Sequence, residues 1–166
     1  MNPLFLAALP LKHTDREGWK RVGILQPESV AAHSWGMCWL IMLLAPEGID
    51  KAKAIELAII HDLAEARVGD ITPHDGISKT EKRALESEAI ASLLAERPSL
   101  QKLWHEYEES ITPEAQFVHD IDRLDMALQA SYYNRELGAD TSEFLESAQK
   151  SVQDTRVKAL IDQLKA

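Results

Sequence analysis

The stretch that decides the fold is AIIHDLAEARVGD, residues 58–70. Its apolar residues recur at helical spacing, and the ligand-type side chains His61, Asp62 and Glu65 lie among them. A buried carboxylate is costly unless it is paired or binds a metal. Neighbouring residues lie about 100° apart around a helix, so both side chains of the His-Asp pair can approach one point. The stretch therefore predicts half of a metal site of the phosphoesterase type, with Asp70 just beyond the glycine that ends the helix.

The composition limits the class of protein. The 166 residues are enough for one domain, and 45% hydrophobic with 27% charged residues is typical of a globular protein. A net charge of −9 argues against a binder of polymeric nucleic acid or of anionic membranes. Cys38 is the single cysteine, so no internal disulfide forms. The apolar segment 4–11 is too short for a membrane span and lacks a preceding basic residue. We therefore expect a cytoplasmic location.

Capping and breaking residues predict an all-α fold in one domain, because no segment alternates polar and apolar residues. The strongest signals are Ser29 and Asp50 as N-caps, a capping box at 78–81, and Pro113 at a first helical position. The expected helices are 5–11, 29–45, 50–69, 78–96, 99–110, 112–137 and, as one or two helices, 141–166. The polar segment 12–21 is expected to be a loop, and its local positive excess could receive an anion.

Other helices must supply the second half of the site. His33 lies on a helix face that is otherwise apolar, so we expect it to point inward. The segment HDIDRLD, residues 119–125, offers three further carboxylates. Asp122 and Asp125 border the apolar stripe of their helix, whereas Asp120 lies further round. Spacing alone leaves both Asp122 and Asp125 as candidate ligands.

The order His, His-Asp, Asp on three helices resembles the HD-domain metal-dependent phosphohydrolases. The resemblance is greatest to the 5'-deoxynucleotidase-like branch, which includes HD domain-containing protein 2. The matching pieces are Arg16 with Gly18-Trp19, PESVAAHSW (27–35), HDLAEARVGDITP (61–73), LWHEYEE (103–109) and DIDRLDMALQA (120–130). The resemblance implies a helical HD-domain bundle over residues 1–166, with a motif core at about 11–133 and C-terminal helices at 141–166 packed on it.

The family pattern implies that the metal ligands are His33, His61, Asp62 and Asp122, and that the second dipeptide, His119-Asp120, has no role in the site. The chemistry agrees, because two neutral imidazoles and two carboxylates balance the charge of a divalent cation. Mixed nitrogen and oxygen ligands suit Mn, Co, Fe, Ni or Zn. We therefore expect one divalent metal ion from this set or Mg. Family members usually carry an acidic residue just before the first histidine, where this chain has Ala32.

The resemblance further implies catalytic or substrate-binding roles for Glu65 and Asp70. Arg16 is expected to bind phosphate oxygens through its planar fork, and Trp19 to stack on the sugar or base or to wall it off. The alternatives are a surface charge for Arg16 and an aromatic at the edge of the core for Trp19. Three basic residues are expected to form a solvated face, namely Lys79, Lys82 and Arg83.

Together these features predict a metal-dependent phosphomonoesterase that releases phosphate from deoxyribonucleoside 5'-monophosphates. The alternatives are a phosphohydrolase of another nucleotide or small phosphoester, and a non-catalytic nucleotide-sensing module on the same fold. The intact ligand set and Glu65 disfavour the non-catalytic alternative. The expected partner is a nucleotide monophosphate, without polymeric nucleic acid or membrane, and a homodimer is left open.

Overall fold

The computed structural model describes residues 3–164. Within this range the chain forms helices joined by turns, without a strand, and Asp15 and Ser29 form an isolated antiparallel bridge. The all-α prediction is therefore confirmed. None of the helices in the described range is long and apolar enough to cross a membrane.

Two short 3-10 helices, η1 (Pro3–Leu6) and η2 (Leu9–Lys12), precede the α-helices. The α-helices are α1 (Glu17–Lys20), α2 (Val30–Leu44), α3 (Lys51–Ile60), α4 (Glu65–Val68), α5 (Lys79–Leu93), α6 (Pro98–Glu109), α7 (Pro113–Leu137), α8 (Ser142–Ser151) and α9 (Thr155–Gln163).

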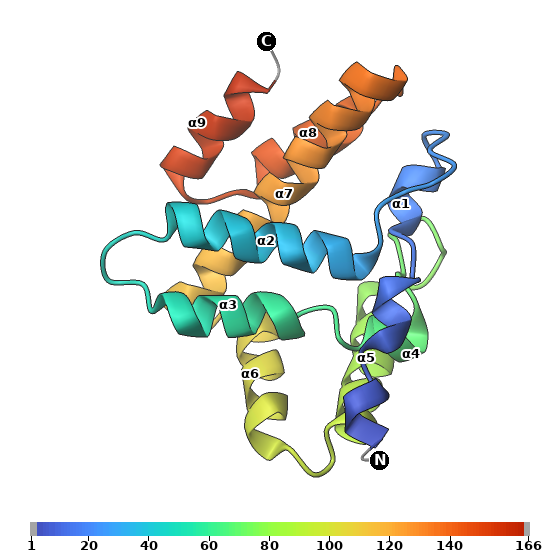
Figure 1. The fold of residues 1–166 in the computed structure, drawn as a ribbon, viewed down its shortest axis with the longest axis vertical. Helices are drawn as coiled ribbons and strands as arrows, with labels where there is room; N and C mark the ends of the chain where they lie inside the picture. The colour runs from blue at the N-terminus through green and yellow to red at the C-terminus, as the bar shows by residue number, and fades with distance from the viewer. Residues whose placement is uncertain (1–2, 165–166) are drawn as a thin grey trace.

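Helices α2 and α3 run antiparallel and both pack on the long helix α7 (Figure 1). Helices α8 and α9 also pack against α7, and α6 lies against α3 and α7. The core between these elements includes Met37 and Ile41 of α2, Leu57 of α3, and Ile121 and Leu124 of α7. Because α7 contacts both members of the antiparallel pair, it can present side chains to the place where α2 begins and α3 ends.

The predicted caps are present. The Ser29 hydroxyl accepts the N–H of Ala32, and Asp50 accepts the N–H of Lys53. Ser78 and Glu81 form the complete capping box that begins α5. These bonds satisfy N–H groups that a helix leaves without internal partners, which is why local sequence was enough to locate the starts.

The helix that carries the His-Asp motif is interrupted, and this part of the prediction was wrong. Helix α3 ends at Ile60, a turn follows, and α4 begins at Glu65. The His61 ring donates through Nδ1 to the carbonyl of Ala58 at 2.8 Å, and Trp104 donates to the carbonyl of His61 at 3.0 Å. Both carbonyls would otherwise serve the helical ladder, so side chains replace the helix at the motif itself.

Two smaller expectations also need correction. The segment 5–11 forms parts of η1 and η2, with Phe5 largely exposed and Leu11 buried. The segment 12–21, expected as a loop, contains the short helix α1.

Asp120, which is not a predicted ligand, is buried and accepts the N–H groups of Gln153 and Asp154. It therefore fixes the connection between α8 and α9 to α7.

Candidate metal centre and active-site cavity

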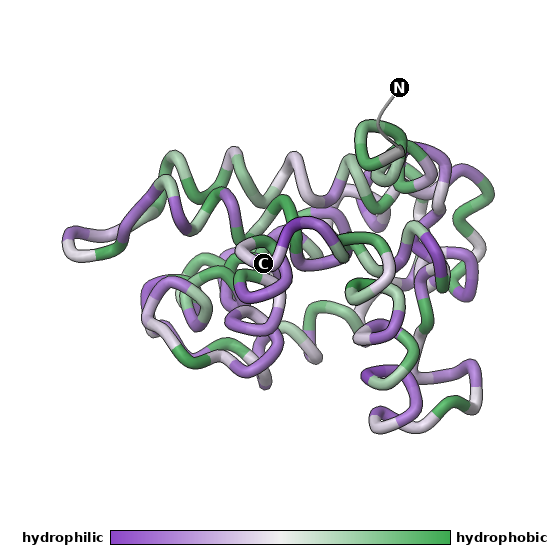
Figure 2. Tube along the Cα trace, turned by 90° about the horizontal axis from the view of Figure 1, so that it is seen from below, coloured by the Kyte–Doolittle hydropathy of each residue, from purple (hydrophilic) through white to green (hydrophobic). Residues whose placement is uncertain are grey.

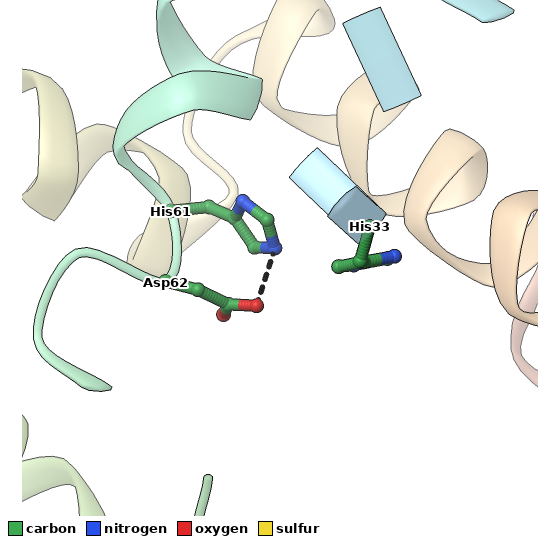
Figure 3. Close-up of side chains that lie close together, drawn as sticks. All are labelled: His33, His61 and Asp62. Carbon is green, nitrogen blue, oxygen red and sulfur yellow. Dashed lines mark ion pairs between the residues drawn. The ribbon is translucent and has the colours of Figure 1, made fainter. Parts of the chain in front are cut away.

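The antiparallel pair α2–α3 brings the two histidines of the motif together. His33 lies in the first turn of α2, and His61 follows the last residue of α3. Both positions lie at similar distances along the chain from the turn that joins the helices, so they meet at the same end of the pair. Figure 3 shows His33 beside His61 and Asp62, and the two rings have centroids 5.4 Å apart.

Three of the four predicted ligands form one compact group. The ligand-type atoms of His33, His61 and Asp62 lie within 4.8 Å of one another. Asp122 on α7 is adjacent, with its Oδ1 3.1 Å from Nε2 of His33. His33 is completely buried, and His61 and Asp122 are also buried. The structure therefore brings three of the predicted ligands together and places Asp122 beside His33 at the edge of the group.

Several atoms of this group lack hydrogen bonds. Among the described residues, the buried Nε2 atoms of His33 and His61, Oδ2 of Asp62 and Oε2 of Glu65 have no hydrogen-bond partner outside the group. Within it, Nε2 of His61 lies 2.9 Å from Oδ2 of Asp62, and Nε2 of His33 lies 3.1 Å from Oδ1 of Asp122. Such orphaned polar atoms are rare and costly in protein interiors. Two imidazole nitrogens and carboxylate oxygens are a suitable donor set for a divalent transition metal. The residues present thus fit a metal ion.

The charges around the group favour ionised carboxylates. Burial alone would raise the pKa of Asp62, but His61 and Arg16 outweigh it and hold this pKa below the usual range. Burial likewise opposes ionisation of Asp122, whose pKa is nonetheless held well below its usual range by Arg123 and His33. Ionised carboxylates are the form that a cation requires.

Glu65 differs from Asp62 and Asp122, because its pKa is raised instead of lowered. It begins α4, and only 4% of its surface is exposed. Burial, followed by the charges of Asp62 and Asp70, raises the pKa of Glu65 to about 10. A carboxyl group with a strongly raised pKa beside a metal-type cluster is a candidate acid or base.

Arg16 lies beside Asp62, with Nη1 3.6 Å from Oδ2 of that carboxylate. Its backbone N–H donates to the carbonyl of Glu28 at 3.0 Å. The next residue, Glu17, donates its N–H to Oδ2 of Asp70 at 2.7 Å. These two bonds anchor the arginine's segment to the start of α2 and to the loop after α4. Asp70, predicted as catalytic, thus has at least a positioning contact.

Trp19 is a buried core residue, with 1% of its surface exposed. Its ring packs against those of Phe144 and Tyr133, with centroids 4.3 and 5.3 Å away, and its Nε1 donates to Glu28. Trp19 borders the cavity, but its faces are occupied by protein aromatics. The structure therefore favours a wall over a stacking surface for this residue.

The sequence predicted that Lys82 lies on a solvated face, and this prediction was wrong. Lys82 lies at the candidate site. Its Nζ donates to the carbonyl of Ile71 at 2.8 Å and lies 3.5 Å from Glu86. Lys82 lines the same cavity as Arg16. The available signal was periodicity, because Lys82 lies one turn before the buried Glu86 and two turns before the buried Ile90 on α5.

A cavity of about 610 Å³ opens over the cluster. This is the usual scale of a small-molecule site. Its walls include Arg16, Glu65, Asp70, Lys82 and Tyr107, together with ligand-type side chains of the cluster. His119 also lines it, but its Nε2 bonds to the carbonyl of Tyr107 and its ring stacks on that tyrosine. The cavity combines a metal-type cluster, several basic side chains that include Arg16 and Lys82, and a protonatable carboxyl group.

The family model described as HD domain matches residues 9–164, so the chain belongs to the HD-domain family. A curated relative, 5'-deoxynucleotidase hdd1 of Schizosaccharomyces pombe, is 40% identical over 163 residues, covering 92% of this chain and 82% of that protein. Human 5'-deoxynucleotidase HDDC2 is 42% identical over 128 residues, or 74% of this chain, which spans 63% of the human protein's length. The family and the 5'-deoxynucleotidase-like branch predicted from the sequence are confirmed.

Solved structures share the fold. A conserved hypothetical protein from Pyrococcus furiosus is 34% identical, with a TM-score of 0.83 over 99% of both chains. The HD phosphohydrolase DatZ of cyanophage S-2L, described as bound to dA and one catalytic Zn²⁺ ion, has a TM-score of 0.63 over 96% of this chain and 92% of that one. At 22% identity, this second likeness shows the fold alone.

The buried Glu65 predicts that the stability of the metal-free protein toward unfolding depends on pH. Its folded-state pKa of about 10 lies far above the usual value of 4.5, so unfolding releases a proton between these pH values. Stability attributable to Glu65 is therefore lost as pH rises through this window. We expect metal-free Glu65→Gln to melt at a higher temperature than metal-free wild type at pH 8, and the gap to close near pH 5. Thermal unfolding by circular dichroism measures this, and a gap independent of pH would contradict it.

Proposed function

We propose that residues 1–166 form one HD domain that hydrolyses deoxyribonucleoside 5'-monophosphates to deoxynucleosides and phosphate, in the cytoplasm. The observation that carries the proposal is the cavity in which orphaned ligand-type atoms face Arg16 and Lys82. A phosphate monoester carries about two negative charges near neutral pH, which suits this combination. The names of relatives at about 40% identity support the nucleotide class.

The proposed metal ligands are His33, His61, Asp62 and Asp122. The donor atoms of the first three lie within 4.8 Å of one another, Asp122 contacts His33, and the two carboxylates lie in surroundings that favour their charged forms. A divalent cation supplies Lewis-acid activation of the phosphate ester and of water. The chain's own contribution is to hold these four side chains in a buried arrangement.

Glu65 is the proposed general base. Its Oε2 has no hydrogen-bond partner and lies in the buried wall beside the cluster. Burial and, after it, the charges of two carboxylates raise the pKa of Glu65, and the positive charge of a bound cation would lower it again. The side chain can then accept the proton that the attacking water loses. Asp70 assists by holding the segment of Arg16 through the N–H of Glu17.

Arg16 and Lys82 form the proposed phosphate clamp. The Arg16 side chain is only 16% exposed. Burial lowers its pKa, but the charges of Asp62 and Asp122 outweigh this effect and raise the pKa above its usual value, so the guanidinium stays charged. Its planar fork matches two phosphate oxygens. Lys82 approaches from α5, and its Nζ is held by the carbonyl of Ile71. The two cations come from different elements that line one cavity.

A phosphate-release screen tests the function. The protein is stripped with a chelator, and Mn²⁺, Co²⁺ or Zn²⁺ is added back with a panel of nucleotides and small phosphoesters. We expect metal-dependent release that is fastest with deoxyribonucleoside 5'-monophosphates. Faster release from another phosphoester would replace the substrate, and no release with any metal would favour the nucleotide-sensing alternative.

We also infer that a second copy of the chain covers the outer face of α2. This helix contains no Asp, Glu, Lys or Arg, and its outer side exposes a continuous stripe spaced as one helical face. The stripe consists of Trp35, Trp39, Met42 and Leu43, which are 71%, 49%, 54% and 59% exposed. Ile59, near the end of the antiparallel helix α3, is also 60% exposed.

The helix that bears this stripe runs along an outer edge of the molecule (Figure 2). Large apolar patches are rare on monomers, and a two-fold symmetric dimer buries one patch against itself. A standard interface needs about 800 Å² from each partner, with an apolar centre and a polar rim. Two tryptophans at the centre are the residue type that dominates binding energy in such interfaces.

The metal assignment predicts a contrast between the two His-Asp dipeptides. His61→Ala or Asp122→Ala removes one of four ligands, so we expect loss of bound metal and of hydrolysis. His119→Ala is the control, because its ring binds the carbonyl of Tyr107 and lies outside the cluster. Elemental analysis after chelation and reloading measures the metal. Wild-type metal content in His61→Ala and Asp122→Ala would contradict the ligand set.

The clamp predicts a change in substrate binding without a change in metal content. We expect Arg16→Ala to raise KM for a deoxynucleoside monophosphate by about tenfold or more, because a buried charge-assisted contact is lost. Arg16→Lys recovers part of the loss, since it keeps the charge but not the fork. Lys82→Ala has a smaller effect in the same direction, and Arg135→Ala, exposed at the end of α7, is the neutral control. Wild-type KM in Arg16→Ala would move the clamp elsewhere.

The dimer predicts a change of mass. Wild type is expected to sediment as a dimer at micromolar concentration, and Trp35→Glu with Trp39→Glu as a monomer, because charges replace the apolar centre. Leu25→Glu is the matched control, since Leu25 is 93% exposed and lies off α2. Analytical ultracentrifugation measures the mass. A monomeric wild type, or equal dissociation by Leu25→Glu, would contradict this interface.

A further inference from the structure

Gly36 lies in the middle of α2, one turn after His33, and its backbone does not explain the glycine. It has no positive φ, unlike five other glycines of the described chain. Glycine inside a helix is destabilising relative to alanine. The space around position 36 explains the glycine, because a Cβ there would lie 2.3 Å from Oδ1 of Asp125 on α7. The carboxylate of Asp125 therefore occupies the place of a side chain at position 36.

Asp125 uses this space to reach the back of His33. Its Oδ2 lies 2.7 Å from Nδ1 of the ring, whereas Nε2 faces Asp122 at 3.1 Å. Glu28 is also close to these two side chains, but its carboxylate already accepts the indole N–H of Trp19. Asp125 is thus the acceptor at Nδ1. An ionised carboxylate can only accept, so Nδ1 donates to Asp125, and Nε2 is the nitrogen whose lone pair a bound cation would take.

The second histidine is oriented in the same sense by a different group. Nδ1 of His61 bonds to the carbonyl of Ala58 at 2.8 Å, which leaves its Nε2 for the cluster. Both rings therefore direct Nε2 to one point. Only the ring of His33 needs a side chain from another helix for this, and only that side chain needs a glycine on α2.

We propose that Gly36 and Asp125 act as a positioning pair for His33: Gly36 leaves the space that lets Asp125 fix the tautomer and orientation of the ring. This rests on the proposed role of His33 as a metal ligand. Partners of metal-binding histidines typically change metal affinity by about 10–100-fold when they are removed. A methyl group at position 36 displaces the carboxylate and has the same consequence.

A double-mutant cycle on metal affinity tests the pair. The dissociation constant for Co²⁺ is measured by competition with a chelator for wild type, Gly36→Ala, Asp125→Ala and the double variant. We expect each single variant to bind about 10–100-fold more weakly. The double variant binds no more weakly than Asp125→Ala, because no carboxylate remains for the methyl group to displace. Additive losses would overturn the pairing.

A conservative variant separates positioning from general loss of structure. Asp125→Asn keeps an oxygen that accepts the Nδ1 proton, so its affinity is expected between those of wild type and Asp125→Ala. Ser34→Ala, one residue after His33 on another side of α2, is the matched control with wild-type affinity. If Gly36→Ala alone does not fold, the double variant and the two Asp125 variants still decide. Equal affinities for Asp125→Asn and Asp125→Ala would overturn the role of the hydrogen bond.

His33→Ala distinguishes failure of this inference from failure of the proposed site. Loss of Co²⁺ in His33→Ala with wild-type affinity in Asp125→Ala would overturn the positioning pair and leave the ligand set intact. Wild-type affinity in His33→Ala would overturn the ligand set itself.

Discussion

The arrangement of this protein depends on ligand-type atoms that are buried together with no hydrogen-bond partner outside their own cluster. Nε2 of His33, Nε2 of His61 and Oδ2 of Asp62 meet where α2 begins and α3 ends, against α7. Burying such atoms is costly, and their mutual proximity makes a cation the natural partner. The antiparallel pair and the long helix beneath it are the frame that keeps these atoms together. The position of the cavity and of its cations follows from this convergence.

Each part of the candidate site is held by a second contact that has no role in chemistry. The two histidine rings are oriented through Nδ1, one by a backbone carbonyl and one by a carboxylate. The segment of Arg16 is tied to Glu28 and, through its neighbour Glu17, to Asp70. Side chains locked by such contacts are already ordered before a ligand arrives, which lowers the entropy lost on binding. This explains why so many polar residues of the site are buried.

Helix α2 combines two demands that are usually separate. Its inner face carries His33, Gly36 and Met37 against α7, and its outer face carries exposed tryptophans. A helix that is apolar on all sides is ordinarily buried on all sides. The cavity shows a similar contrast, because basic residues gather around it although the chain as a whole has a net charge of −9. Both features concern where charge and apolar surface lie, which overall composition does not reveal.

Local signals in the sequence determined the helix starts. Ser29, Asp50 and the capping box at 78–81 each place a side-chain oxygen on a free N–H, an interaction over three residues that needs no tertiary context. Periodicity correctly turned His33 inward, because an apolar face has only one favourable direction. The resemblance to the HD-domain family then fixed the family, which the comparisons confirm.

Other features arise from contacts between residues far apart in the chain, and only the tertiary structure decided them. The helix ends at the His-Asp motif because Trp104 and the His61 ring take its carbonyls, and Trp19 is buried because Phe144 and Tyr133 meet it. Spacing left Asp122 and Asp125 equivalent, yet one faces Nε2 of His33 and the other Nδ1. The sequence by itself determined where the capped helices begin and that His33 points inward, since these depend on near neighbours. Which nitrogen of a buried ring meets which carboxylate depends on how two helices pack, and no local pattern encodes that.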